Sequence, residues 1–431
     1  MSFLLLCATL ALLLAIGVPI AFALGLATLC TMLLSVDPVP ALTTMAQRMA
    51  GGINSFALLA IPLFILSGNL MARGGIARRL VNFARALVGA LPGGLALVNV
   101  VACTLFGAIS GSAIAATSAV GGVMIDEMRR EGYGRAFGTA LTAAASTTGM
   151  LIPPSNILIV YAVASGGVSV AALFLGGYVP GVLLALALMG VCLLYTRRAG
   201  LRGGPRSSAA EVAHASFSAL PSLMLIVLVI GGIVGGAFTA TEAGAIAVIY
   251  AFVLAVLVYR EVAPGEIAGI LLKSAETTAV VMLLIATSTC LSWILAYENI
   301  PQLISETLLG FSDNPLLILL MINLVLLLVG AFMDMTPAVL VFTPIFLPVA
   351  TALGMSPLHF GIMLVMNLCI GLCSPPVGSL LFVSSAIGGT RIGEIVRPLL
   401  PMYLAMFLAL IVVTYVPETA LWLPRLFGLA D

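Results

Sequence analysis

Four short segments place polar or helix-breaking residues inside long apolar stretches of this chain. Two carry hydroxyl or carboxylate groups, Ser110-Gly111-Ser112 and Asp334-Met335-Thr336, and two carry paired prolines, Pro153-Pro154-Ser155 and the run SPPVG at 374–378. Because proline removes a backbone donor and disfavours helix in the residue before it, nearby carbonyls lose their intrahelical partners. Freed carbonyls and hydroxyls are ligands for a hard cation such as sodium, whereas the N-termini of interrupted helices attract anions.

The four segments form two matching pairs. Gly107 opens the motif GAISGSA and Gly330 opens GAFMDMTP, 223 residues further on, and the dipeptides Phe137-Gly138 and Phe360-Gly361 have the same separation. Further matches follow both dipeptides in the same order: Gly149 and Gly371, the two proline pairs, and then Gly166-Gly167 and Gly388-Gly389. A duplicated unit is therefore predicted, and paired interruptions in two halves indicate the midplane binding site of a secondary transporter.

Asp334 is the single residue that most strongly indicates function, because a carboxylate inside an apolar stretch is costly and usually functional. It could neutralise a bound cation. Alternatively, it could cap the helix that follows it by accepting hydrogen bonds from backbone amides. The sequence alone leaves both roles open.

Other polar side chains in apolar stretches favour structural roles. The asparagines are expected to form interhelical hydrogen bonds, the histidines to be solvated without metal-ligand spacing, and the cysteines to pack rather than bind a metal. These residues are Asn99, Asn323 and Asn367, His214 and His359, and the pair Cys369 and Cys373.

Composition restricts the class of protein. The chain has 431 residues, of which 62% are hydrophobic and 8% charged, so it is predicted to be an all-α polytopic membrane protein with short aqueous loops. No basic patch with interleaved aromatic residues is present, which argues against nucleic-acid binding. The N-terminal apolar stretch lacks a basic region and a cleavage signal, so we expect a membrane span there rather than a signal peptide.

Charged clusters divide the first half, 1–196, into elements. Residues 1–72 are expected to hold three scaffold spans, the first two separated at Gly17-Val18-Pro19, and the Arg-rich amphipathic arm 74–94 to lie along the membrane surface. Residues 95–125 are split near Ser110 into arms too short to cross, so they predict a re-entrant hairpin. A broken span at 136–165 and a span at 180–196 complete this half.

The second half repeats this order after a polar cytoplasmic linker at 197–218. It covers 219–431, with three scaffold spans in 219–297, the third at 275–297, an arm at 298–312, a hairpin at 316–350, a broken span at 360–387 and a last span at 398–416. Five crossings per half give the two repeats opposite orientations. Because flanking arginines favour the cytoplasm, the first hairpin is expected to enter from the cytoplasm and the second from the periplasm.

Several long motifs in this order resemble a known family. They are GAISGSAIAATSAVGG at 107–122, EGYGRAFGTALTAAASTTGMLIPPSNILIVYA at 131–162, FTATEAGA at 238–245, GAFMDMTPAVLVFTPIFLP at 330–348 and HFGIMLVMNLCIGLCSPPVGSLLFV at 359–383, with LLAIPLFILSGNLM at 58–71. The chain resembles, over nearly its whole length, the large membrane subunit of tripartite ATP-independent periplasmic (TRAP) transporters.

The resemblance implies a sodium-driven, elevator-type importer of organic acid anions in a bacterial inner membrane, and not an enzyme. It implies a separate small four-span membrane subunit and a periplasmic substrate-binding protein as partners, and sodium as coupling ion without another cofactor. The matching positions for sodium are Ser110, Gly111, Ser112, Ile152, Ser155, Gly330, Asp334, Thr336, Cys373, Ser374, Val377 and Gly378. Those for the substrate are Ser110, Pro153, Pro154, Asn156, Thr336, Pro375 and Pro376.

Two departures from the family pattern are visible, since Ser374 replaces a usual Thr and Asp126 a common Pro. A stand-alone, hairpin-containing anion permease is the alternative transporter. An intramembrane enzyme using Ser110 is disfavoured, because no His or Lys is expected near it in the membrane. No membrane-embedded Arg or Lys is expected to bind the substrate carboxylate, so helix termini, bound sodium and loop arginines are expected to share that work.

Overall fold

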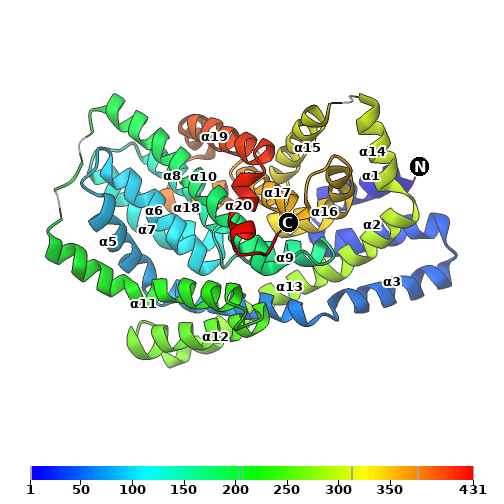
Figure 1. Cartoon of the computed structure of the whole chain (residues 1–431), viewed down its shortest axis with the longest axis horizontal. Helices are drawn as coiled ribbons and strands as arrows, with labels where there is room; N and C mark the ends of the chain where they lie inside the picture. The colour runs from blue at the N-terminus through cyan, green and yellow to red at the C-terminus, as the bar shows by residue number, and fades with distance from the viewer. Residues whose placement is uncertain (1, 202, 206, 312–313, 376–377, 431) are drawn as a thin grey trace.

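The described part of the chain is entirely helical. The computed structural model describes residues 2–201, 203–205, 207–311, 314–375 and 378–430. Within these ranges the chain forms α-helices α1 to α20, a short 3-10 helix at Phe56–Leu59 and a π-helical turn at Val253–Val258, with no β-strand. Figure 1 shows the helices packed into one body, with α3, α11 and α12 along its lower side.

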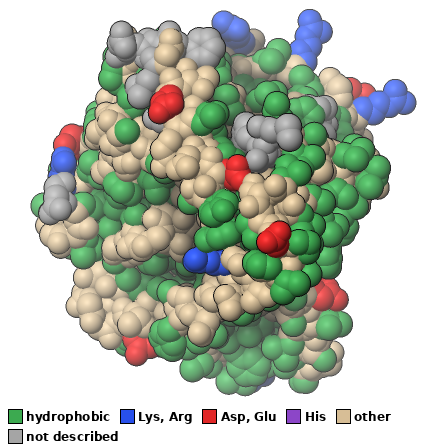
Figure 2. Space-filling model, turned by 90° about the vertical axis from the view of Figure 1, so that its right-hand side faces the viewer, with side chains coloured by type: hydrophobic (Ala, Val, Ile, Leu, Met, Phe, Trp, Pro, Cys, Tyr) green, Lys and Arg blue, Asp and Glu red, His purple; other side chains and the backbone are tan. Residues whose placement is uncertain are grey.

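Many of the helices have the length and apolar composition of membrane spans. Among the described residues, seven helical segments are long and apolar enough to cross a bilayer, and an eighth is added if one bent pair counts as a single span. Large hydrophobic side chains such as Phe22, Phe217, Ile249 and Leu404 are exposed. On the face in Figure 2, hydrophobic side chains cover much of the surface and charged ones are scattered. The chain is therefore a multi-pass membrane protein.

The first half begins with short helices and an amphipathic arm. Helices α1 and α2 are separated at Gly17, which has a φ of 83°. The arm helix α5 buries Ile76, Leu80, Val81 and Ala84, and it packs against α6 and α11. The helices are α1 (Ser2–Ala15), α2 (Ile20–Ser35), α3 (Pro38–Ile53), α4 (Ala60–Arg73), α5 (Ile76–Val88), α6 (Gly94–Ser110), α7 (Ala113–Arg130), α8 (Arg135–Leu151), α9 (Asn156–Ala164) and α10 (Val170–Ala199).

The second half has a similar order of elements. Its helices are α11 (Ala209–Val234), α12 (Ala240–Phe252), α13 (Pro264–Tyr297), α14 (Ile300–Phe311), α15 (Pro315–Gly330), α16 (Met335–Ala352), α17 (Pro357–Leu372), α18 (Ser379–Gly388), α19 (Ile392–Tyr415) and α20 (Glu418–Leu426). Helices α6 and α7 occupy the first segment predicted as a hairpin, and α15 and α16 the second. Helices α8 and α9 meet at an angle of 53°.

Several helices differ from the sequence prediction. Helix α13 begins at Pro264, eleven residues before the predicted start at 275, because its charged residues continue the helix instead of ending it. The predicted linker 197–218 is partly helical, since α11 begins at Ala209, where the Ser208 hydroxyl accepts from the Glu211 backbone amide. Helices α3 and α20 were not predicted.

The matching glycines of the two halves make the same contact. Gly107 of α6 lies against Gly149 of α8, and a Cβ added at Gly107 would be 2.9 Å from the Gly149 Cα. Gly330 of α15 lies against Gly371 of α17, with the same 2.9 Å for a Cβ added at Gly330. In each half, therefore, the first hairpin helix and the first part of the broken span touch backbone to backbone.

Interhelical hydrogen bonds reinforce both contacts. Asn99 donates to the Thr142 hydroxyl at 2.8 Å in the first half, and Asn367 donates to the Asn323 side-chain oxygen at 2.8 Å in the second. The structural role predicted for these asparagines is thus confirmed. His359, in contrast, was predicted to be solvated, and this is wrong: its ring is buried and its Nε2 lies 2.6 Å from the Val413 carbonyl oxygen.

The two broken spans pack against each other at the centre. The thiols of Cys369 and Cys373 on α17 donate to the carbonyls of Thr147 and Ala143 on α8, at 3.6 and 3.5 Å. Both cysteines are fully buried. They are packing residues at this interface, as predicted.

The glycine contacts predict which substitutions destabilise the protein. Gly371→Ala should lower the free energy of unfolding by about 1–3 kcal/mol, because its Cβ would overlap the Gly330 backbone. Gly122→Ala is the matched control, since a Cβ there meets nothing within 4 Å. Thermal unfolding of both variants in detergent, followed by tryptophan fluorescence, measures the difference. Equal unfolding temperatures would contradict the close contact.

Candidate functional site

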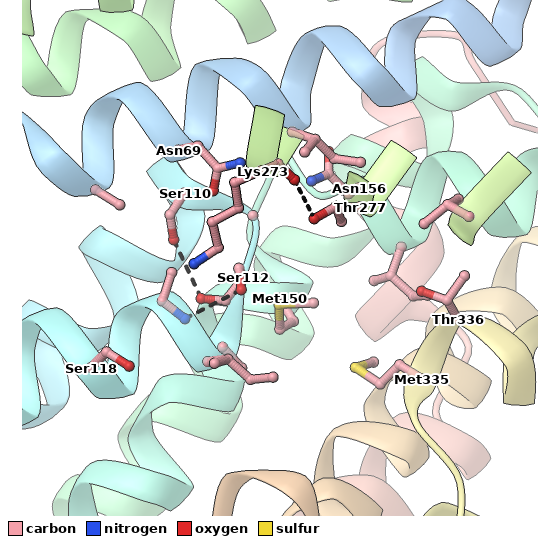
Figure 3. A pocket seen from close by; sticks show the side chains of 18 of the residues that line it. Asn69, Ser110, Ser112, Ser118, Met150, Asn156, Lys273, Thr277, Met335 and Thr336 are labelled. Atoms are coloured by element: carbon pink, nitrogen blue, oxygen red, sulfur yellow. Dashed lines mark hydrogen bonds between the residues drawn. The ribbon is translucent and has the colours of Figure 1, made fainter. Parts of the chain in front are cut away.

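One large cavity, of about 890 Å³, lies between the tips of the two predicted hairpins. Figure 3 shows Ser110 and Ser112 on one side of it and Met335 and Thr336 on the other. Helices α4, α9 and α13 complete the lining with Asn69, Asn156 and Lys273, among other residues. Segments more than 200 residues apart in the sequence thus meet around one space.

The first tip is a tight turn between α6 and α7. Gly111 has a φ of 61° and ends α6, and Ser112 begins α7, its hydroxyl accepting from the Ala115 amide at 3.2 Å. The Ser110 hydroxyl donates to the Ser112 carbonyl at 3.3 Å. All three tip residues line the cavity, with Ser112 at the N-terminus of a helix.

The break between α8 and α9 lies beside this tip. A Cβ added at Gly111 would be 3.1 Å from the Asn156 side-chain nitrogen and 3.6 Å from the Pro154 carbonyl oxygen. Asn156 and Ile157, in the first turn of α9, line the cavity. Pro153, Pro154 and Ser155 are buried behind them, and Ile152 is partly buried against Gly181 of α10.

The second tip brings Asp334 to the cavity. Asp334 is the N-cap residue of α16, but its side chain makes no capping hydrogen bond. It is exposed where it borders the cavity, with Met335 and Thr336 beside it. Asp334 forms no salt bridge with any described Arg, Lys or His. Its carboxylate does interact with the backbone amide of Met335, the first residue of α16, so both predicted roles, cation binding and helix capping, remain predictions.

Three helix N-termini therefore open on the same cavity, those of α7, α9 and α16. Each exposes backbone N–H groups without intrahelical partners and carries the positive end of a helix dipole. Together with the hydroxyls of Ser112 and Thr336, they make the cavity suitable for an anion. The carboxylate of Asp334 makes the same region suitable for a cation.

The described residues of the fourth predicted segment are not part of the cavity lining. Leu372 lines it, but Cys373, Ser374, Pro375, Gly330 and Gly378 do not, and Pro376 and Val377 fall outside the described residues. Gly378 packs against the carbonyl oxygens of Leu372 and Ser374, so a Cβ there would overlap them. Tyr403 of α19 donates to the Cys373 carbonyl.

Ser379 next to this turn was missed by the sequence analysis. Its hydroxyl oxygen is buried and has no hydrogen-bond partner among the described residues. A buried hydroxyl without a hydrogen-bond partner, next to a turn in which the Leu372 and Ser374 carbonyl oxygens approach Gly378, is suitable for a hard cation. Its position in the sequence could have indicated a site residue, because Ser379 directly follows the SPPVG run.

The expectation that no Arg or Lys within a membrane helix faces the substrate region is wrong for Lys273. Lys273 of α13 lines the cavity, together with Arg73 at the end of α4. The predicted span began at 275, after Lys273, because charge was taken as a span boundary. Lys273 is instead accommodated within a continuous helix because its side chain is exposed in the cavity rather than to lipid.

The presence of Lys273 does not make Ser110 a nucleophile. The Ser110 hydroxyl donates to the Ser112 carbonyl, and no hydrogen bond joins it to Lys273 in the described structure. A serine activated for catalysis needs a base within hydrogen-bond distance. The geometry thus gives no support to an intramembrane enzyme.

Comparison with known proteins gives a consistent result. The family model described as "Tripartite ATP-independent periplasmic transporter, DctM component" matches residues 7–419. An uncharacterised Salmonella typhimurium protein, YgiK, is 53% identical over 97% of this chain and 96% of its own. The C4-dicarboxylate TRAP transporter large permease protein DctM of Pseudomonas aeruginosa is 44% identical, over 94% of this chain and 95% of its own.

Two further matches extend the comparison. The sialic acid TRAP transporter large permease protein SiaM of Vibrio cholerae is 40% identical, over 95% of this chain and 96% of its own. The Alcanivorax borkumensis YdaH transporter has a similar fold, with a TM-score of 0.65 at 16% identity over 93% of this chain and 91% of its own. This chain belongs to the DctM family of TRAP transporter large permeases.

Proposed function

We propose that this chain imports an organic acid anion, coupled to sodium, and that the anion binds in the cavity between the two hairpin tips. The observation that carries the proposal is the convergence of three helix N-termini and the Asp334 carboxylate on that cavity. Helix N-termini stabilise a negative group without a fixed side-chain partner. An unpaired carboxylate in an apolar setting requires a cation for neutralisation.

The substrate class follows from the relatives. Their names give C4-dicarboxylates, sialic acid, isethionate and 2,3-diketo-L-gulonate, all of which are acids. Backbone amides and hydroxyls can bind an acidic group in molecules that otherwise differ in structure. We therefore propose an organic acid as the substrate of this chain.

Sodium would bind on the oxygen-rich side of the cavity and at the SPPVG turn. The cavity lining offers the carboxylate of Asp334, the hydroxyl of Thr336, and the hydroxyls and backbone turn of the first-tip residues 110–112. At the other turn, the carbonyl oxygens of Leu372 and Ser374 approach Gly378, and the next residue, Ser379, has a buried hydroxyl without a hydrogen-bond partner among the described residues. Both sets consist of the hard oxygen donors that an alkali cation prefers.

The rest of the proposal concerns movement, partners and location. The hairpins and broken spans of the two inverted repeats would move together past the scaffold helices α1 to α4 and α11 to α13, as an elevator. A periplasmic binding protein would deliver the acid, and a separate small membrane subunit would brace the scaffold. The membrane would be the bacterial inner membrane.

Reconstitution tests this function. Vesicles with this chain and the small subunit should take up labelled succinate or sialic acid only with a sodium gradient and the binding protein. That result supports a tripartite importer, because delivery is then obligatory. Sodium-dependent uptake that persists without a binding protein would instead identify a stand-alone permease.

Loss of the Asp334 charge should abolish sodium coupling. We expect Asp334→Asn to reduce sodium-dependent uptake by about 10–100-fold, as the cation loses a charged ligand. Binding of the small subunit and the unfolding temperature should be unchanged. The matched control is Asp126→Asn, an exposed carboxylate of α7 outside the cavity lining. Unaltered sodium dependence in Asp334→Asn would remove the ion role.

Removal of a single hydroxyl should have a smaller effect. Ser110→Ala and Ser374→Ala should each raise the sodium concentration for half-maximal uptake, by about 3–10-fold for one lost ligand. Ser165→Ala, at the far end of α9, serves as control because its hydroxyl bonds only the Ala162 carbonyl. Sodium titration of uptake measures the change. A drop in thermal stability with unchanged sodium dependence would favour a packing role.

A further inference from the structure

Charge is distributed unevenly over the lining of the cavity. The part formed by α7, α9 and α16, which includes both tips, offers hydroxyls, amides and the Asp334 carboxylate, but no Arg or Lys. The part formed by α4 and α13 contains Arg73 and Lys273, the two basic residues among the described residues that line the cavity. An anion in the cavity thus finds its positively charged side chains on α4 and α13 only.

Lys273 is the better placed of the two. Figure 3 shows its amino group directed into the cavity, toward the tip with Ser110 and Ser112. It is exposed, and it forms no salt bridge with any described acidic residue. The nearest acid of α13 in the lining, Glu266, is about 10 Å away along the helix and accepts from the Ala263 amide at 2.9 Å. The ammonium of Lys273 is therefore available to a ligand.

The motif Ser67-Gly68-Asn69 of α4 holds Lys273 and the tip in place. Asn69 donates to the Ser274 hydroxyl at 2.9 Å, which ties α4 to α13 next to Lys273. Gly68 lies directly against the Ser110 carbonyl, leaving no room for a Cβ. Ser67 donates to the Ala247 carbonyl of α12 at 3.2 Å. Asn69 and Gly68 thus fix the position of α13 relative to the first tip, and Ser67 ties the same helix to α12.

We propose that Lys273 is a specificity-determining residue that binds an acidic group of the substrate from the scaffold side. This rests on the proposed function, since it assumes an organic acid in the cavity. The acid would bridge the helix N-termini of α7, α9 and α16 and the ammonium of Lys273 on α13. Because these two parts of the lining move past each other in the proposed cycle, the contact exists only in some positions and changes affinity between them.

Charge removal and charge rescue test this role. We expect Lys273→Met to raise the KM for labelled succinate at least about tenfold, because a charge-assisted hydrogen bond is lost. The sodium concentration for half-maximal uptake should not change. Lys273→Arg should keep the KM within about threefold of wild type, since it keeps the charge. The unfolding temperature and small-subunit binding serve as folding controls.

A chemical rescue separates charge from shape. In a Cys7→Ser, Cys30→Ser background, which removes the two exposed thiols, Lys273→Cys should show the raised KM. Aminoethyl methanethiosulfonate, which restores an ammonium, should lower the KM again, whereas the sulfonatoethyl reagent should not. Equal rescue by both reagents, or a wild-type KM in Lys273→Met, would refute the role of Lys273 and leave the proposed function intact. If wild-type vesicles take up none of succinate, sialic acid, isethionate and 2,3-diketo-L-gulonate with sodium, the proposed function itself fails.

Discussion

The structure depends on one constraint: backbone polar groups at membrane depth must be satisfied inside the protein or face a watery cavity. The chain interrupts its helices at four places and directs three of the resulting N-termini, those of α7, α9 and α16, into one cavity. The unsatisfied N–H groups thereby form the surface that we propose to bind the anion. The groups that are hardest to place in lipid are thus the ones proposed to bind the substrate.

Close backbone contacts make this arrangement possible. Gly107 with Gly149, and Gly330 with Gly371, let each first hairpin helix lie directly on the first part of the neighbouring broken span. Asn99 and Asn367 add interhelical hydrogen bonds at comparable places. Because the same glycine contact occurs twice, each half positions its own tip, and the packing of α8 on α17 holds the two halves together.

The sequence predicted the interruptions well, because Gly and Pro act on the backbone locally. It also identified Asn99, Asn323 and Asn367, since a polar amide in an apolar helix needs a partner. It failed where tertiary structure decides: Lys273 was read as a span boundary, although a cavity solvates it within a continuous helix, and His359 was read as solvated, although the Val413 carbonyl satisfies it. Which interruptions share one space could not be predicted from spacing alone, and Ser374, Pro375 and Gly378, the described residues of the SPPVG turn, do not line the cavity.

The central claim is that an organic acid and sodium occupy the cavity between the two tips. The most direct measurement is the alkylation rate of a cysteine introduced at Ser112 and, separately, at Thr336, on opposite sides of that cavity. The account predicts that the transported acid slows alkylation at both positions, and only when sodium is present. Alkylation that the acid slows at neither position, or at one alone, would contradict a shared site.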